Sequence, residues 1–146
     1  MKVLLDTGKV DPDSKDRCGR TPLWYAAERG YEAVVKVLLG TSKVDVDSED
    51  DGGDTPLLLA AENGHEAIVK LLLGTGKVDP NSKDRCGRTP LRYAAERGYK
   101  AVMKVLLGTS KVDADSKDIC GRTPLRYAAE RGHEAVVRLL QSSLAT

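Results

Sequence analysis

Apolar residues along the chain form short clusters of two kinds, separated by polar stretches. In the first kind, Leu23, Ala26 and Ala27 recur at the i, i+3, i+4 spacing of one helix face. The second kind, EAVVKVLL at 32–39, is apolar nearly all round, which predicts a helix buried on more than one side. The stretch TSKVDVDSED at 41–50 is polar and predicts a loop. The pattern therefore predicts two short helices followed by a loop.

Residues at the ends of these clusters are typical of helix boundaries. Thr21 suits an N-cap, because its hydroxyl can accept hydrogen bonds from the first helical turn, and Pro22 suits the first helical position, where no N–H is needed. Gly30 predicts a left-handed end to the first helix, and Gly40 ends the second. Residues 16–20 predict a turn before the first helix. Helices of roughly two or three turns are unstable alone in water, so each pair must pack on its neighbours.

The same pattern recurs every 34 residues. Thr-Pro-Leu begins at Thr21, Thr55, Thr89 and Thr123. A fixed period of about 20–50 residues is typical of a linear stack. A catalytic site needs its residues only once, so the repetition argues against an enzyme. We number the predicted units as a partial repeat at 1–15, repeat 1 at 16–49, repeat 2 at 50–83, repeat 3 at 84–117 and a terminal repeat 4 at 118–146.

One whole unit, DRCGRTPLWYAAERGYEAVVKVLL at 16–39, resembles the ankyrin repeat. The shared positions are an Asp, a turn Gly, Thr-Pro-Leu, Ala-Ala, a Gly, and then Val-Val and Leu-Leu. The resemblance covers the whole chain and implies an all-α ankyrin-repeat solenoid of helix–turn–helix units with loop or β-turn tips. Two features depart from the common ankyrin repeat. The loop is one residue longer, and the usual His after Thr-Pro-Leu is replaced by Trp24, Leu58, Arg92 and Arg126.

The amino-acid sequence of the repeats is also similar to the repeat regions of large fungal multidomain proteins that resemble innate-immunity receptors. This similarity implies that the array is the recognition part of a longer protein. Met1 aligns with Val35, so the sequence begins inside a second helix without a polar cap. We therefore predict a fragment of a longer array. Its uncapped end, at Val3, Leu4 and Leu5, would favour end-to-end self-association.

Composition and charge limit the kinds of protein to which this chain can belong. Apolar residues make up 40% of the chain, but aromatic residues only 4% with no Phe, so the core must come from Ala, Val and Leu. A net charge of +1 gives no bulk argument for nucleic acid or an anionic membrane. No apolar run approaches the roughly 18 residues of a membrane span, and the first residues do not form a secretory signal. Three cysteines, an odd number, favour a reducing compartment, which predicts a cytoplasmic or nuclear protein.

Segments that suggest metal or phosphate binding lack residues that the known binding motifs require. Segments such as DVDSED begin like a calcium loop, but counted from Asp45 the sixth place holds Asp50 and the twelfth Pro56, where the loop needs Gly and Glu. Asx-type turns explain these aspartates better. GTGK at 74–77 lacks the Ser or Thr that must follow the lysine of a phosphate loop. We predict neither a metal nor a cofactor.

The cysteines and histidines occupy repeated positions. Cys18, Cys86 and Cys120 share one position beside the turn glycine, so neighbouring copies lie too far apart for a disulfide or a zinc site. An exposed thiol at a contact surface remains the functional alternative. His65 and His133 share the position of Tyr31 and Tyr99, which indicates a structural role and no catalytic residues.

In ankyrin-like stacks, turn tips and first helices line a concave groove that binds a protein partner. Carried over by position, the resemblance predicts a basic surface in repeats 1, 3 and 4 and an acidic one in repeat 2. Such a pattern would select a partner of complementary charge. The predicted partner-binding residues are Arg17, Arg20, Trp24, Glu28, Arg29, Asp51, Asp54, Glu62, Asn63, Arg85, Arg88, Arg92, Glu96, Arg97, Ile119, Arg122, Arg126, Glu130 and Arg131.

Within this set Trp24 is the leading candidate, because Trp and Arg are enriched among binding hot spots. The alternative is that Trp24 packs on the next repeat. The arginines also have an alternative, since Arg92–Glu96 and Arg126–Glu130 are i,i+4 pairs that can satisfy each other. For the whole chain, the alternatives to a protein-interaction module are a passive or designed repeat scaffold and, less favoured, an Arg-rich surface for nucleic acid.

Overall fold

The computed structural model describes residues 12–41, 44–109 and 111–145. Within these residues the regular elements are eight helices, with no strand. The uncapped apolar end predicted at 3–5 lies outside the described residues, so self-association through it stays a prediction. The helices are α2 (Pro22–Arg29), α3 (Glu32–Leu39), α4 (Pro56–Glu62), α5 (Glu66–Gly74), α6 (Pro90–Arg97), α7 (Lys100–Leu107), α8 (Pro124–Glu130) and α9 (Glu134–Ala145).

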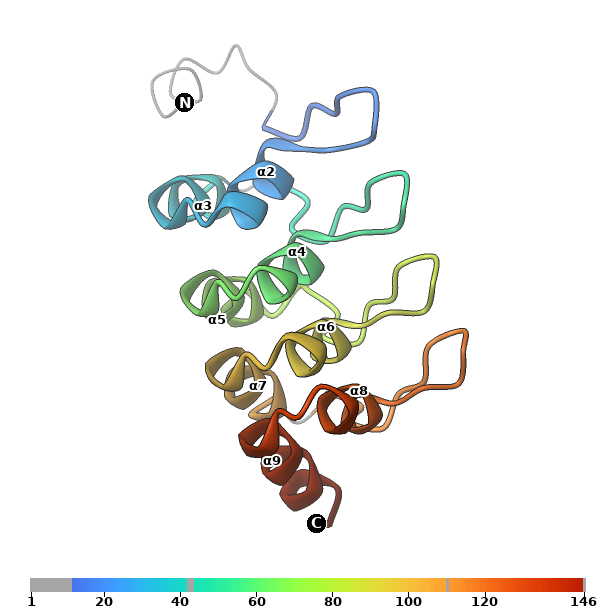
Figure 1. Ribbon diagram of the computed structural model, residues 1–146. Coiled ribbons are helices and arrows are strands. Elements are labelled where there is room, and N and C mark those ends of the chain that lie inside the picture. Colours follow the sequence, from blue (N-terminus) through green and yellow to red (C-terminus); the bar gives the residue numbers. More distant parts are fainter. Residues whose placement is uncertain (1–11, 42–43, 110, 146) are drawn as a thin grey trace.

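The helices stack in two rows (Figure 1). The first helices α2, α4, α6 and α8 pack against one another in chain order, and the second helices α3, α5, α7 and α9 do the same. Each first helix also packs against the second helix that follows it. The loops between repeats project to one side of the rows (Figure 1). The predicted all-α helix–turn–helix solenoid is confirmed.

Each first helix begins and ends through the groups that the sequence predicts. In all four repeats the threonine before the helix is the N-cap, and its hydroxyl accepts a hydrogen bond from the N–H three residues later. Proline occupies the first turn, where an N–H would have no partner. In repeats 1 and 3 the helix ends at Gly30 and Gly98, which adopt the left-handed conformation with φ of 80° and 75°.

The core runs along the stack between the two rows of helices. It consists mainly of Leu, Val and Ala, as the composition predicts. The leucine after Thr-Pro is fully buried as Leu23, Leu57 and Leu91. The Ala-Ala pairs that follow are buried as well in repeats 1 to 3. Burying one such leucine contributes about 1.5–3 kcal/mol, and each layer is completed by residues of the next repeat.

Histidine rings connect neighbouring repeats at the C-terminal ends of first helices. His65 Nε2 lies 3.0 Å from the carbonyl oxygen of Glu28, and His133 Nε2 lies 2.9 Å from that of Glu96. The His133 ring packs against Gly98, where an added Cβ would lie 2.6 Å from Nδ1. The structural role predicted for the two histidines is confirmed. The structure adds that each ring contacts the preceding repeat.

The aspartates of the polar loops form turns. The side chains of Asp45, Asp79 and Asp113 each accept a hydrogen bond from the N–H two residues later, which is the predicted Asx turn. The loops are also linked to one another, since Asp47 Oδ2 accepts from the N–H of Asp79 at 3.2 Å and Asn81 Oδ1 accepts from that of Asp113 at 2.6 Å. The loop side chains therefore hold successive loops in register.

Candidate protein-binding surface

The turn tips form a row that is held together by main-chain atoms. The N–H of Asp51 donates to the carbonyl of Cys18 at 2.9 Å, that of Arg85 to Gly52 at 3.1 Å, and that of Ile119 to Cys86 at 3.1 Å. The side chains of the donor residues take no part in these bonds. The tip position can therefore carry different side chains without disturbing the row, provided that the residue has a backbone N–H and so is not proline.

The residues at this tip position differ in chemistry and are accessible. Along the row they are Arg17, Asp51, Arg85 and Ile119, all exposed. Ile119 is 73% exposed, the highest value among the large hydrophobic residues in the described part of the chain. The side chains of Arg17 and Arg85 make no hydrogen bond or ion pair with the described residues. The tips thus present two unpaired cations, one carboxylate and one apolar side chain.

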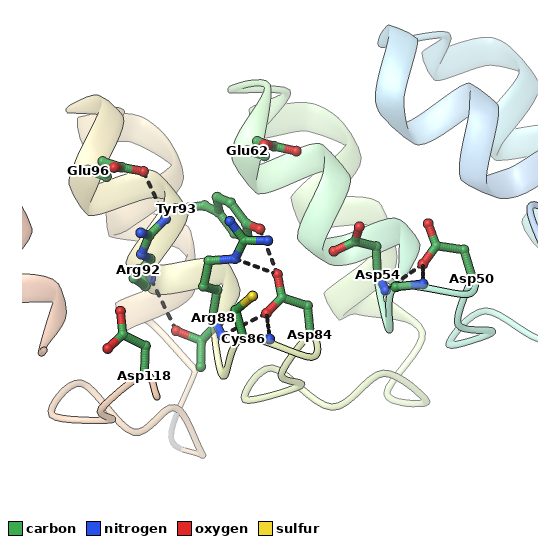
Figure 2. A network of polar contacts seen from close by, with 12 residues as sticks. Asp50, Asp54, Glu62, Asp84, Cys86, Arg88, Arg92, Tyr93, Glu96 and Asp118 are labelled. Carbon is green, nitrogen blue, oxygen red and sulfur yellow. Dashed lines mark hydrogen bonds and ion pairs between the residues drawn. The ribbon is translucent and has the colours of Figure 1, made fainter. Parts of the chain in front are cut away.

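In three repeats the turn aspartate behind the tip accepts a hydrogen bond from a tyrosine hydroxyl, and in repeat 3 it also accepts one from an arginine side chain. In repeat 3, Asp84 Oδ2 accepts from the Tyr93 hydroxyl and from Arg88 Nε, both at 2.7 Å (Figure 2). Burial alone would raise the pKa of Asp84, but these hydrogen bonds outweigh it and lower the pKa below its usual value. Tyr25 donates to Asp16 and Tyr127 to Asp118 in the same way. We call Asp84, Arg88 and Tyr93, with the residues at the same positions of repeats 1 and 4, the Asp-Arg-Tyr network; the arginine side chain bonds the aspartate in repeat 3.

Repeat 2 lacks this network because Asp54 replaces the arginine and Leu59 replaces the tyrosine. Asp50 Oδ1 still accepts from the turn amides, but its Oδ2 accepts from Trp24 Nε1 of repeat 1 at 2.9 Å. Asp54 lies beside Asp50 (Figure 2). Its half-buried side chain makes no hydrogen bond or ion pair with the described residues. Burial, reinforced by the charges of Asp50, Asp84 and other carboxylates, raises the pKa of Asp54 to about 6.

Trp24 is a packing residue at the junction of repeats 1 and 2. Only 5% of its surface is exposed. The Arg20 guanidinium lies 4.5 Å from the centre of its ring, and Tyr25 packs edge-on at 5.0 Å. These contacts favour the alternative that Trp24 packs on the next repeat. The prediction that it leads partner binding must be revised, because little of the indole is accessible.

Several of the predicted arginines are paired with glutamates, as the i,i+4 spacing indicates. Arg92 Nη1 lies 2.8 Å from Glu96 Oε1, and Arg126 Nε lies 2.9 Å from Glu130 Oε1. Arg92 is also packed over the ring of Tyr127 at 4.1 Å, and its side chain is only 12% exposed. Arg131 reaches back to Glu96 at 2.9 Å. Arg92 therefore belongs to the junction of repeats 3 and 4 more than to the open surface.

The predicted partner-binding residues fall into three groups by exposure. Trp24 alone is buried. The half-buried residues are Arg20, Glu28, Asp54, Glu62, Arg88, Arg92, Glu96 and Arg122. The exposed residues are Arg17, Arg29, Asp51, Asn63, Arg85, Arg97, Ile119, Arg126, Glu130 and Arg131. Cys18, Cys86 and Cys120, beside the tips, are free and exposed.

The sequence predicts a packing position for Tyr25 and Leu59 but does not predict the hydrogen bond that the tyrosine makes to the turn aspartate. A signal for it was present in the sequence. The one repeat that loses the tyrosine also loses the arginine, and the preceding repeat is the only one with a tryptophan. These three changes are physically linked through Asp50.

A family model described as ankyrin repeats (three copies) matches residues 1–84 and 73–145. The chain belongs to this family. No curated protein matches it significantly. Ankyrin repeats are generally protein–protein interaction modules and typically have no catalytic activity. No helix in the described ranges is long and apolar enough to cross a membrane. Among the same residues, no group of three or more His, Cys, Asp or Glu side chains is arranged to hold a metal ion.

Proposed function

We propose that this chain is a recognition module that binds a protein partner across its turn tips and first helices. The observation that carries the proposal is the contrast between a constant frame and variable side chains. Main-chain bonds fix the tips, while the exposed tip residue changes from Arg17 to Asp51, Arg85 and Ile119. A partner could be selected by these residues without any change in the fold.

The energetics of binding favour such a surface. A frame that is already ordered loses little conformational entropy when it binds, so more of the contact energy appears as affinity. Arginine and exposed apolar side chains are common in interface centres. The exposed Ile119, with Arg126 of α8 in the same repeat, supplies both kinds of contact.

Peptide selection tests the proposal. The complete 146-residue chain is used to select peptides from a random displayed library, and their affinities are compared among variants. Ile119→Ala and Arg126→Ala should weaken at least some selected peptides about tenfold, because hot-spot truncation costs over about 1 kcal/mol. Lys70→Ala, on a second helix, is the control and should change nothing. Equal affinity in all variants, or no selected peptide, would contradict the proposal.

The wider setting is also a proposal. The repeat sequences are similar to those of fungal multidomain proteins. This similarity supports a place for the array in a longer receptor-like protein, in the cytoplasm or nucleus. The 34-residue spacing supports the repeat boundaries given above. A passive or designed scaffold remains the alternative, and it predicts that the selection yields no peptide that depends on the tips.

Nucleic-acid binding has less support, because several arginines already have carboxylate partners. Arg92 and Arg131 both contact Glu96, and Arg88 contacts Asp84. Retention on DNA or RNA that falls steeply with added salt, whatever the sequence of the nucleic acid, would favour this rival.

A further inference from the structure

The break in the Asp-Arg-Tyr network at repeat 2 carries information about the partner, provided that the proposed function holds. In repeat 3 the guanidinium of Arg88 neutralises Asp84 from within the chain. At the equivalent place in repeat 2, Asp54 supplies a second carboxylate beside Asp50. The surface therefore lacks a cation at the one repeat where two carboxylates meet.

The charged groups around Asp54 come from three elements, and carboxylates predominate. Asp50 belongs to the same turn, Glu62 to α4, and Asp84 to the next repeat. The charge of Arg88 lowers the pKa of Asp54, but less than the carboxylates raise it, and Arg88 Nε already binds Asp84. Glu62 forms a long ion pair, in which its Oε2 lies 3.6 Å from Arg97 Nη2. The carboxylates around Asp54 thus outweigh the nearby cations.

The neighbouring tips have the opposite sign. Arg17 of repeat 1 and Arg85 of repeat 3 are exposed and unpaired within the described residues, and they flank the exposed Asp51. The pattern along the tips of repeats 1 to 3 is therefore positive, negative, positive. A segment with the complementary pattern is acidic, basic, acidic.

We propose that the partner presents an extended segment in which a Lys or Arg binds at Asp54, flanked by acidic residues that face Arg17 and Arg85. Packed helices of successive repeats lie about 8–10 Å apart. An extended chain advances about 3.3 Å per residue, so the flanking acids stand about three residues from the basic one. The basic side chain replaces the arginine that repeat 2 lacks.

The test compares the natural chain with two variants in the peptide selection described above. Asp54→Asn removes only the charge. The second variant combines Asp54→Arg and Leu59→Tyr with Trp24→Leu, because Trp24 otherwise occupies the Asp50 oxygen that the tyrosine would use. Its residues are those at the junction of repeats 2 and 3, where Leu58 precedes Asp84, Arg88 and Tyr93, so the fold already accommodates them. Peptides selected by the natural chain should contain the acidic–basic–acidic pattern. They should bind at least about tenfold more weakly to both variants, as expected when one member of a partly buried charge pair is lost.

Replacing the basic residue of a selected peptide by glutamine should cause a similar loss with the natural chain and little further loss with Asp54→Asn. Affinity for the natural chain should also fall between pH 7.5 and pH 5, because protonation removes the charge of Asp54. The Asp54→Asn variant should lack that part of the pH dependence.

The outcomes separate this inference from the proposed function. Selected peptides that lack a basic residue, or that bind the variants equally well while still responding to Ile119→Ala or Arg126→Ala, would overturn the inference and leave the function standing. Failure to select any peptide, or indifference to every change on the tips and first helices, would overturn both.

Discussion

At the scale of single residues, the junction of repeats 1 and 2 shows how one substitution constrains another. Leu59 removes a hydroxyl that elsewhere donates to the turn aspartate, and the Trp24 indole N–H from the preceding repeat takes over that role at Asp50. A polar group left without its partner on burial costs about 1–3 kcal/mol. The tryptophan is therefore explained by its neighbour.

Replacing Trp24 by Phe keeps most of the ring volume but removes the N–H donor. We expect this change to lower the free energy of unfolding by about 1–3 kcal/mol, measured by urea denaturation. Arg126→Ala, at the equivalent exposed position of repeat 4, is the control and should change stability by less than about 0.5 kcal/mol. Unchanged stability in Trp24→Phe would show that the bond to Asp50 contributes nothing.

Asp54 gives a prediction about pH. Its pKa is about 6 in the folded chain and about 3.9 when unfolded, so between these values the folded state binds more protons. The penalty for its charge is complete at pH 7 and disappears towards pH 4. Asp54→Asn should therefore be more stable than the natural chain at pH 7, by roughly 1–2 kcal/mol once half-exposure is allowed for.

The same comparison at pH 4 should show little difference between the two proteins. Measuring both by urea denaturation at each pH isolates Asp54 from the carboxylates with lowered pKa, such as Asp84, which weaken both proteins alike in acid. A stability difference that does not change with pH would rule out the unpaired charge as its cause.

At the scale of helices, the sequence predicts what is local and misses what crosses between repeats. Thr21 and Gly30 mark the ends of α2 because each acts within a few residues of its own helix. The contact of His65 with Glu28 spans 37 positions and that of Trp24 with Asp50 spans 26. Such contacts depend on how the repeats stack, which periodicity alone does not specify.

The residues of the candidate surface show the same contrast between local features and contacts with the next repeat. The exposure of Ile119 at a tip follows from its place in the repeat. The burial of Trp24 and the packing of Arg92 over Tyr127 depend on the repeat that comes next. Composition could identify these residues as binding candidates, but only the stacked arrangement shows which of them are already occupied by internal contacts.

The glycine that ends a first helix offers a matched test of one inter-repeat contact. Gly98 and Gly132 have nearly the same positive φ, 75° and 73°, but only Gly98 is covered by a histidine ring. Ala at either position suffers the left-handed strain of about 1–2 kcal/mol. Gly98→Ala must also displace His133, so it should cost at least about 1 kcal/mol more than Gly132→Ala in urea denaturation. Equal costs would mean that the ring moves aside freely.

At the scale of the whole molecule, stability should vary along the stack. Among the described helices, α4 packs between α2 and α6, whereas α8 packs against a single first helix, α6. In linear arrays each repeat gains much of its stability from such interfaces. In the 146-residue chain we expect amide hydrogen exchange, followed by mass spectrometry, to be slower in α4 and α6 than in α8. Uniform protection would indicate that the array unfolds as one cooperative unit.

The tip-to-tip bonds have an evolutionary consequence. They join main-chain atoms, so a duplicated or deleted unit would meet its new neighbour with the same donor and acceptor. Unequal crossing-over could therefore lengthen or shorten the array without redesigning a junction. Side-chain contacts limit this freedom at two junctions, since Asp50 of repeat 2 accepts from the indole of repeat 1 and Glu96 of repeat 3 pairs with Arg131 of repeat 4. A gene rearrangement that separates either pair of repeats loses its contact, so we expect each pair to be inherited together.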